Sequence, residues 1–179
     1  IIVAAAVRLN DGGPAFFTQE RVGLDGTTFT MIKFRTMRVD AEAMKDSLAE
    51  ANEADASAGN SIMFKMANDP RITRIGSFLR KTSIDELPQL FNVLRGDMSL
   101  VGPRPPLPSE VAQYEPRVMG KFAVRPGITG LWQISGRSNL SWDETVHLDL
   151  SYAQHRSLTL DAWIMLQTVP ALLRSEGAY

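Results

Sequence analysis

The chain has 179 residues, enough for one domain with a hydrophobic core and too few to argue for two. Its 19 basic and 20 acidic residues give a net charge of −1, so no general field attracts nucleic acid, and we expect no nucleic-acid partner. The absence of cysteine excludes disulfides, thiolate metal sites and cysteine nucleophiles. Hard-metal chemistry through oxygen ligands stays open.

The chain opens with an apolar run from Ile1 to Val7. This run is far shorter than the ~20 residues that a membrane-spanning helix needs. Two interpretations stay open: a buried or unstructured N-terminal segment, or the tail of a longer apolar segment. The Gly- and Pro-rich residues 10–14 then separate this run from the rest of the chain.

Residues 16–22 and 27–36 are rich in Phe, Thr and Ile and flank a Gly-containing turn, which predicts a β-hairpin. Alternation places Lys33 and Arg35 on one face of the second strand. Two cations at this spacing could hold a phosphate or could form a solvated face. After the hairpin we expect an acidic surface helix over residues 40–55 and a second helix that starts at Asp69 and Pro70.

Asp85 and Glu86 are two adjacent carboxylates in a segment that also contains several arginines. Ser83 and Glu86 fit a capping box, in which neither acid would be catalytic. Pro88, however, would then interrupt the helix, whereas a helix that begins at Pro88 leaves both acids in the turn before it. Nearby cations and helix-end N–H groups favour an ionised carboxylate, which could act as a nucleophile or bind Mg²⁺.

Arg80, Arg95 and Arg104 surround this pair in sequence, so guanidinium groups could bracket a multiply charged anion such as paired phosphates. The prolines between positions 103 and 108 predict an extended arm that holds Arg104 rigidly.

The last third of the chain predicts a short strand at residues 131–134 and a helix that a capping box opens at Ser141. A final, very apolar helix is expected over residues 160–174. It could pack on the core or lie in a bilayer surface.

Five segments in order resemble the catalytic domain of the bacterial sugar transferases, the monotopic polyprenyl-phosphate phosphoglycosyl transferases. Among them are Lys-Phe-Arg-Thr-Met from Lys33 and Ser-Ile-Asp-Glu-Leu-Pro-Gln-Leu from Ser83. The segments are residues 13–23, 33–37, 83–90, 96–105 and 125–133. The resemblance implies an α+β fold with one compact catalytic domain over residues 10–179, a small antiparallel hairpin and membrane-interfacial helices. Residues 1–9 would be the tail of a re-entrant membrane helix.

The resemblance further implies transfer of a sugar 1-phosphate from a UDP-sugar to polyprenyl (undecaprenyl) phosphate, with release of UMP. Asp85 would be the nucleophile that forms a phosphosugar-aspartyl intermediate, and Glu86, with Asp85, would bind Mg²⁺. Arg80 would hold a phosphate and Arg104 the nucleotide end, and Lys33 and Arg35 also match family positions. The C-terminal part looks most like members that use UDP-glucose or UDP-galactose.

By the same resemblance the protein would initiate exopolysaccharide, capsule or O-antigen-type glycan synthesis. It would contact membrane lipid at the cytoplasmic face of the bacterial inner membrane. A homo-oligomer is left open. The competing hypothesis is a non-catalytic peripheral membrane module that binds sugar nucleotides or organises a glycan assembly complex.

Overall fold

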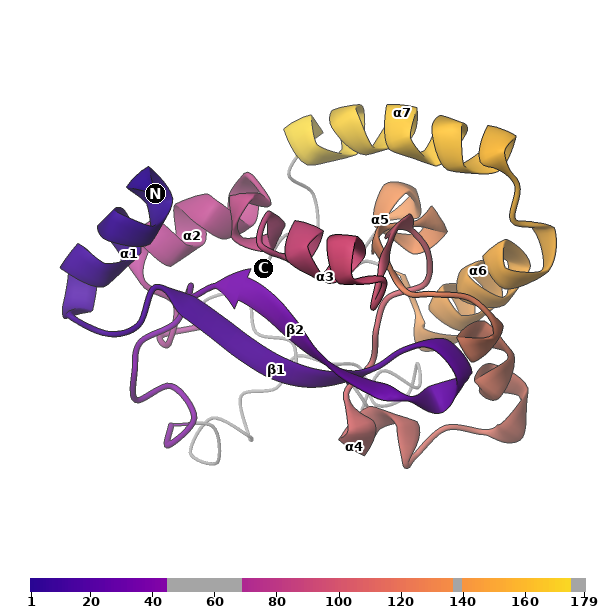
Figure 1. Cartoon of the computed structure of the whole chain (residues 1–179), viewed down its shortest axis with the longest axis horizontal. Coiled ribbons are helices and arrows are strands. Elements are labelled where there is room, and N and C mark those ends of the chain that lie inside the picture. The colour runs from indigo at the N-terminus through magenta and orange to yellow at the C-terminus, as the bar shows by residue number, and fades with distance from the viewer. Residues whose placement is uncertain (45–68, 137–139, 175–179) are drawn as a thin grey trace.

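A computed structural model describes residues 1–44, 69–136 and 140–174 of the chain, which fold into helices around two small sheets (Figure 1). The predicted acidic helix over residues 40–55 lies largely outside the described residues. In chain order the elements are α1 (Ile2–Asp11), β1 (Phe16–Val22), η1 (Leu24–Gly26), β2 (Thr28–Phe34), α2 (Arg74–Lys81), η5 (Ile84–Glu86), α3 (Gln89–Arg95), β3 (Ser99–Val101), α4 (Pro108–Val111), η6 (Pro116–Ala123), β4 (Gly127–Thr129), α5 (Leu131–Ser135), α6 (Trp142–His155) and α7 (Leu158–Arg174).

The predicted hairpin is confirmed: β1 and β2 pair antiparallel from Phe16 opposite Phe34 to Val22 opposite Thr28. Its turn uses two residues with positive φ, Asp25 at 54° and Gly26 at 75°. The Phe16 and Phe34 rings stack with centroids 5.3 Å apart at the other end. The hairpin is a long twisted ribbon that runs across the molecule below α3 in Figure 1.

The second sheet is a parallel pair of three-residue strands, β3 and β4. The two backbones approach so closely that a Cβ on Gly127 would lie 2.1 Å from the Gly102 nitrogen, so only glycine fits there. Val101 at the end of β3 packs with Val124, Tyr152 and Ile164 into the hydrophobic core. This core joins the small sheet to the C-terminal helices.

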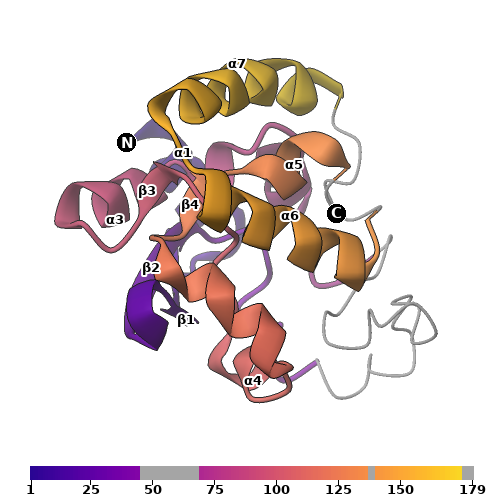
Figure 2. The ribbon, with the colours of Figure 1, turned by 90° about the vertical axis from the view of Figure 1, so that its right-hand side faces the viewer.

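The C-terminal helices α5, α6 and α7 pack against one another and on the small sheet, with α7 lying across the top of the molecule (Figure 2). The capping box at Ser141 is confirmed, because its hydroxyl accepts from the Glu144 backbone and the Glu144 carboxylate accepts from the Ser141 backbone. The prediction of a strand at residues 131–134 is wrong, since these residues form α5. Ile164 of α7 is fully buried, whereas Leu166 and Leu173 are exposed, so α7 packs on the core and also presents an apolar face.

Helix α2 begins later than predicted, at Arg74 with Thr73 as its N-cap. The carboxylate of Asp69 accepts from the side chain and backbone of Arg71 instead of capping a helix, and Ile72 bridges to Met37. Residues 69–72 therefore form a turn, closed by the Ile72 N–H donating to the Asp69 carbonyl at 3.1 Å, beside the chain that follows β2.

The N-terminal residues form helix α1, which ends at Gly12 in the left-handed region with φ 74°. Arg35 joins this helix to the end of the hairpin through a two-nitrogen contact with Asp11. Val7 is buried, whereas Ile1, Ile2 and Leu9 are exposed. None of the helices in residues 1–44, 69–136 and 140–174 combines the length and apolarity needed to cross a membrane. The re-entrant segment stays a prediction.

Candidate active site

Asp85 and Glu86 lie in η5, a single 3-10 turn between α2 and α3. The turn starts at Ser83, which has φ 54° and ψ 18°, a left-handed conformation that costs free energy in a residue other than glycine. Pro88 then occupies the N-cap position of α3, as expected from its fixed φ. The prediction that both acids lie in the turn before a helix at Pro88 is confirmed.

Helix α3 is fixed to the hairpin by Asn92, whose side chain is fully buried. Its amide oxygen accepts from the backbone of Ile32 at 3.1 Å and its amide nitrogen donates to the Thr30 carbonyl at 2.8 Å. These are the groups that a third strand would otherwise satisfy. Asn92 therefore locks the outer edge of β2 to the helix that follows the carboxylates.

Glu86 faces the hairpin and accepts a hydrogen bond from the Lys33 ammonium, with Nζ 2.7 Å from Oε1. Both side chains are partly exposed, at 25% for Lys33 and 34% for Glu86. The structure thus brings together two of the residues predicted for the site. Glu86 is held in place by this contact and still faces solvent.

Asp85 is buried, with 7% of its surface exposed, and its carboxylate has no ion-pair partner in the described part of the chain. Burial raises the pKa of Asp85 to about 6, and Glu86 raises it further, while Lys33 and Arg80 act in the opposite direction. The expectation that cations and helix ends determine the pKa of Asp85 is therefore wrong, because desolvation has the larger effect. Asp85 is still mainly ionised at neutral pH.

Arg80 reaches the same place from the last turn of α2, where its Nε donates to the Thr36 hydroxyl at 2.9 Å. The helix can approach this closely because Gly76 has no Cβ, which would lie 1.9 Å from the Thr36 carbonyl oxygen. Burial lowers the pKa of Arg80, and the charges of Asp85 and Asp69 favour its cationic form. Arg80 is thus a guanidinium within electrostatic range of Asp85, and its role in phosphate binding stays a prediction.

Arg35 and Arg104 have carboxylate partners outside the Asp85 turn. Arg35 is buried against α1 and also donates to the backbone carbonyls of Pro14 and Met37. Arg104 donates from both terminal nitrogens to Glu110, at 2.9 and 3.2 Å. Their roles in substrate binding stay predictions, and the structure gives each a bracing role.

The donor set at η5 suits a hard divalent cation. Asp85 and Glu86 supply carboxylate oxygens, and Mg²⁺ in enzymes is commonly held by one or two carboxylates together with substrate phosphates. No group of three or more acidic or imidazole side chains is gathered anywhere in residues 1–44, 69–136 and 140–174. A cation here would therefore need ligands from the substrate as well.

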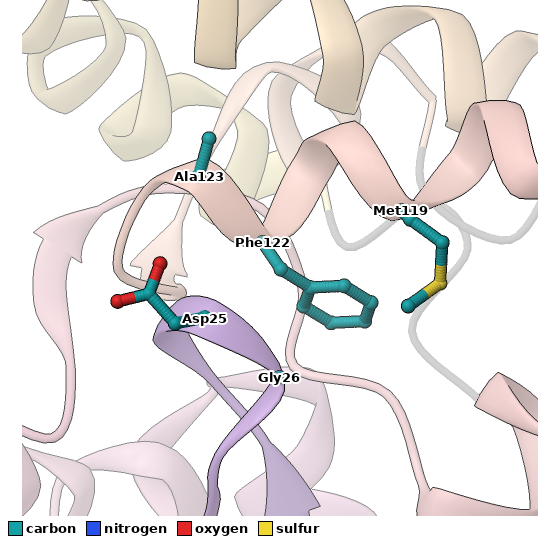
Figure 3. Close-up of a pocket in the computed structure, with 5 residues that line it drawn as sticks. All are labelled: Asp25, Gly26, Met119, Phe122 and Ala123. Carbon is teal, nitrogen blue, oxygen red and sulfur yellow. The ribbon is translucent and has the colours of Figure 1, made fainter.

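A cavity of about 240 Å³ lies at the opposite end of the hairpin (Figure 3). Its lining comes from the hairpin turn and η6: Asp25, Gly26, Met119, Phe122 and Ala123. Strand β2 separates it from Lys33 by about 20 Å at 3.3 Å per residue. It is thus remote from the carboxylate pair.

Sequence reasoning missed Arg21, which lies on the same face of the hairpin as Lys33. Its Nη1 donates to the carbonyl of Pro105, which is 84 positions away in the chain. Strand alternation could have placed Arg21 on the Lys33 face. Its contact with residues 103–108, the proline segment, joins distant parts of the chain and could not be read from the sequence. Arg21 thus adds a cation to this face of the hairpin.

The geometry defines a buried carboxylate, without an ion-pair partner among the described residues, beside a second acid and cations that suit phosphate. The chain belongs to the bacterial sugar transferase family, whose pattern matches residues 1–175. It is 52% identical over 169 residues to the galactosyl transferase CpsE of Streptococcus agalactiae and 48% identical over 170 residues to an undecaprenyl-phosphate galactose phosphotransferase of Salmonella typhimurium. It is 40% identical over 189 aligned residues to a UDP-glucose:undecaprenyl-phosphate glucose-1-phosphate transferase of Caulobacter vibrioides.

These alignments cover 94%, 94% and 100% of this chain. They cover 36%, 35% and 64% of the three relatives, so the chain spans roughly a third of the first two. The carboxylate turn, the hairpin and the proline segment all lie within the family match.

Proposed function

We propose that the site transfers a sugar 1-phosphate, from a UDP-hexose, to polyprenyl phosphate such as undecaprenyl phosphate. The proposal is carried by one observation: Asp85 is a buried carboxylate, without an ion-pair partner among the described residues, between Arg80 and the Lys33–Glu86 pair. A buried carboxylate that lowers the stability of the folded state is typical of a catalytic site. The names of the relatives supply the class of substrate.

In the first step an Asp85 carboxylate oxygen attacks the phosphorus that bears the sugar. The bond from this phosphorus to the oxygen bridging the two phosphates breaks, and that oxygen leaves with UMP. A phosphosugar remains on Asp85. In the second step a phosphate oxygen of the polyprenyl acceptor attacks the same phosphorus, the acyl phosphate bond breaks, and the Asp85 carboxylate is regenerated with polyprenyl diphosphosugar as product.

The neighbouring residues have separate tasks in this scheme. Arg80 binds oxygens of the attacked phosphate and spreads their charge. Lys33 orients Glu86 through their 2.7 Å contact and adds a positive charge near Asp85. Glu86, with Asp85, would hold Mg²⁺, which supplies charge neutralisation of the diphosphate when bound. Arg35 and Arg104 would be secondary residues, with Arg104 toward the nucleotide end as the resemblance implies.

We further propose that the exposed apolar side chains of the helices contact membrane lipid, at the cytoplasmic face of the bacterial inner membrane. Helices α1, α3 and α7 lie along the upper side of the molecule in Figure 1. Each of them carries large apolar side chains in contact with solvent: Ile1, Ile2, Leu9, Leu90, Phe91, Leu94, Leu158, Trp163, Leu166, Val169 and Leu173. Such a surface is typical of an interfacial helix and would bring the site to a lipid-linked acceptor.

The test is a single-turnover experiment on the full-length protein in lipid, with UDP-glucose, UDP-galactose and Mg²⁺ but without acceptor. We expect one equivalent of UMP and a mass increase of one hexose phosphate on the peptide that contains Asp85. Asp85→Asn should abolish both, whereas Asp143→Asn, an exposed carboxylate of α6, should leave both unchanged. Turnover that survives Asp85→Asn would exclude the covalent mechanism, and unchanged UDP-sugar in the parent protein would favour a non-catalytic binding module.

A further inference from the structure

A band of charged side chains runs from the carboxylate turn along the hairpin to the proline segment and η6. Most of its members are matched in pairs of opposite charge, and Arg21 lies between the first pair and the second. The pairs are Lys33 with Glu86, Arg104 with Glu110, and Lys121 with Asp149.

Arg21 lies on β1, on the face of the hairpin that also carries Gln19 and Lys33. Its Nη2 donates to the side-chain oxygen of Gln19 at 2.6 Å and its Nη1 to the Pro105 carbonyl at 3.0 Å. Its Nε is buried without a hydrogen-bond partner among the described residues. The guanidinium is thus fixed in orientation by neutral oxygens only.

A desolvated cation without an anion at hydrogen-bonding distance opposes folding. Burial, together with the positive charge of Arg104, lowers the pKa of Arg21 to about 10, so the group remains cationic at neutral pH. Glu110 and Glu86 act on it only through space, since each has its own cationic partner. Arg21 therefore carries a positive charge with no carboxylate at hydrogen-bonding distance among the described residues.

The positions of the cations along the hairpin indicate which phosphate Arg21 could bind. Arg80 contacts Thr36 just beyond the strand, Lys33 holds Glu86 within it, and Arg21 lies opposite Phe29 farther along. The nucleophile is thus at one end of the band, and Arg21 lies farther along it, beyond Lys33. In phosphoryl transfer the leaving group departs on the side opposite the nucleophile, where a fixed cation stabilises the charge that develops.

We propose that Arg21 binds the nucleotide-side phosphate of the donor, which is the leaving phosphate. This role rests on the proposed function, because it assumes a nucleoside diphosphate bound across the carboxylate turn and the hairpin. A phosphate oxygen would provide the anion that the buried guanidinium lacks, in place of the neutral Pro105 carbonyl. Arg104, which Glu110 already neutralises, would then hold the proline segment against α4.

The test uses the full-length protein in lipid with Asp85→Asn in every variant, so that no donor is consumed. Ligand-observed NMR, which reaches millimolar affinities, gives the dissociation constants of UDP and of uridine. We expect Arg21→Met to weaken UDP binding 10- to 100-fold and to leave uridine binding unchanged, with partial recovery in Arg21→Lys. Arg117→Met, which removes an exposed guanidinium from η6, is the matched control and should change neither.

Equal weakening of UDP and uridine by Arg21→Met would show that Arg21 only supports the proline segment, and would overturn the proposal. Unchanged UDP binding in Arg21→Met would overturn it as well. A parent protein that binds neither UDP nor a UDP-sugar would contradict the proposed function itself, and this result is distinguishable because it appears before Arg21 is altered. A thermal melt of each variant accompanies the binding data.

Discussion

Asp85 and Glu110 are two buried carboxylates, with 7% and 4% of their surfaces exposed, that the fold treats in opposite ways. Glu110 accepts two hydrogen bonds from Arg104 and one from the backbone of Leu107 at 2.8 Å. Although burial pushes the pKa of Glu110 upward, these contacts hold it below its usual value. Burial without such partners raises the pKa of Asp85 to about 6.

The difference separates a carboxylate that stabilises the structure from one that is available for chemistry. Glu110 closes the proline segment onto α4, and its hydrogen-bonding capacity is used within the protein. Asp85 has no ion-pair partner among the described residues and lies in a turn that starts from a left-handed Ser83. We therefore expect removal of the two carboxylates to have opposite effects on the free energy of unfolding.

The largest effect is expected for Glu110→Ala, which should lower the free energy of unfolding by about 3 kcal/mol. The change leaves Arg104 partly buried without its counter-charge and removes the side-chain acceptor of the Leu107 backbone. Urea unfolding of the full-length protein in detergent, followed by tryptophan fluorescence, measures it.

The control for this change is the double variant Arg104→Met with Glu110→Leu. Replacing both members of a buried ion pair by apolar groups is often nearly neutral, so the double variant should lose less stability than Glu110→Ala alone. A double variant as unstable as Glu110→Ala would mean that the Leu107 contact, rather than the ion pair, dominates.

Asp85→Asn should act in the opposite direction and raise the free energy of unfolding by about 2 kcal/mol at pH 7.5 without divalent metal. The pKa of Asp85 is higher in the folded state than its ordinary 3.8, so its ionisation opposes folding. This destabilisation is absent below the ordinary pKa of 3.8, where the group is protonated in both states, grows as pH rises toward about 6, and is constant above that, where the group is ionised in both states. Melting temperatures of both proteins between pH 4 and 8 in EDTA should therefore diverge up to about pH 6 and then run parallel, and curves that are parallel below pH 6 would contradict the assignment.

The elements that the sequence predicts correctly are those determined by residues close together in the chain. The hairpin follows from alternating Phe, Thr and Ile around a glycine turn, and the start of α3 follows from Pro88. The failures come from competing or short local signals. Asp69 binds Arg71, two positions away, instead of capping α2, and residues 131–134, too few to show a period, form a helix.

The candidate site shows the same division. Sequence placed Asp85 and Glu86 in one turn and named Lys33 and Arg80 as neighbours, which the structure brings together. It could not give the burial of Asp85, which depends on the packing of η5 against α2 and the hairpin. It also could not find Arg21, because the Pro105 carbonyl that orients it is far away in sequence.

The smallest expected effect concerns the Lys33–Glu86 pair, which is partly exposed and lies beside Asp85. Lys33→Met alone should change the free energy of unfolding by less than about 1 kcal/mol, as is usual for such pairs. Lys33 also favours the ionised form of Asp85, whereas Glu86 opposes it. Removing Lys33 should therefore increase the free-energy cost of the ionised Asp85 carboxylate in the folded state. Asp85→Asn should then stabilise the Lys33→Met protein by about 0.5 kcal/mol more than it stabilises the parent. A double-mutant cycle at pH 7.5 measures this coupling, and a coupling of the opposite sign would mean that Lys33 does not act on Asp85.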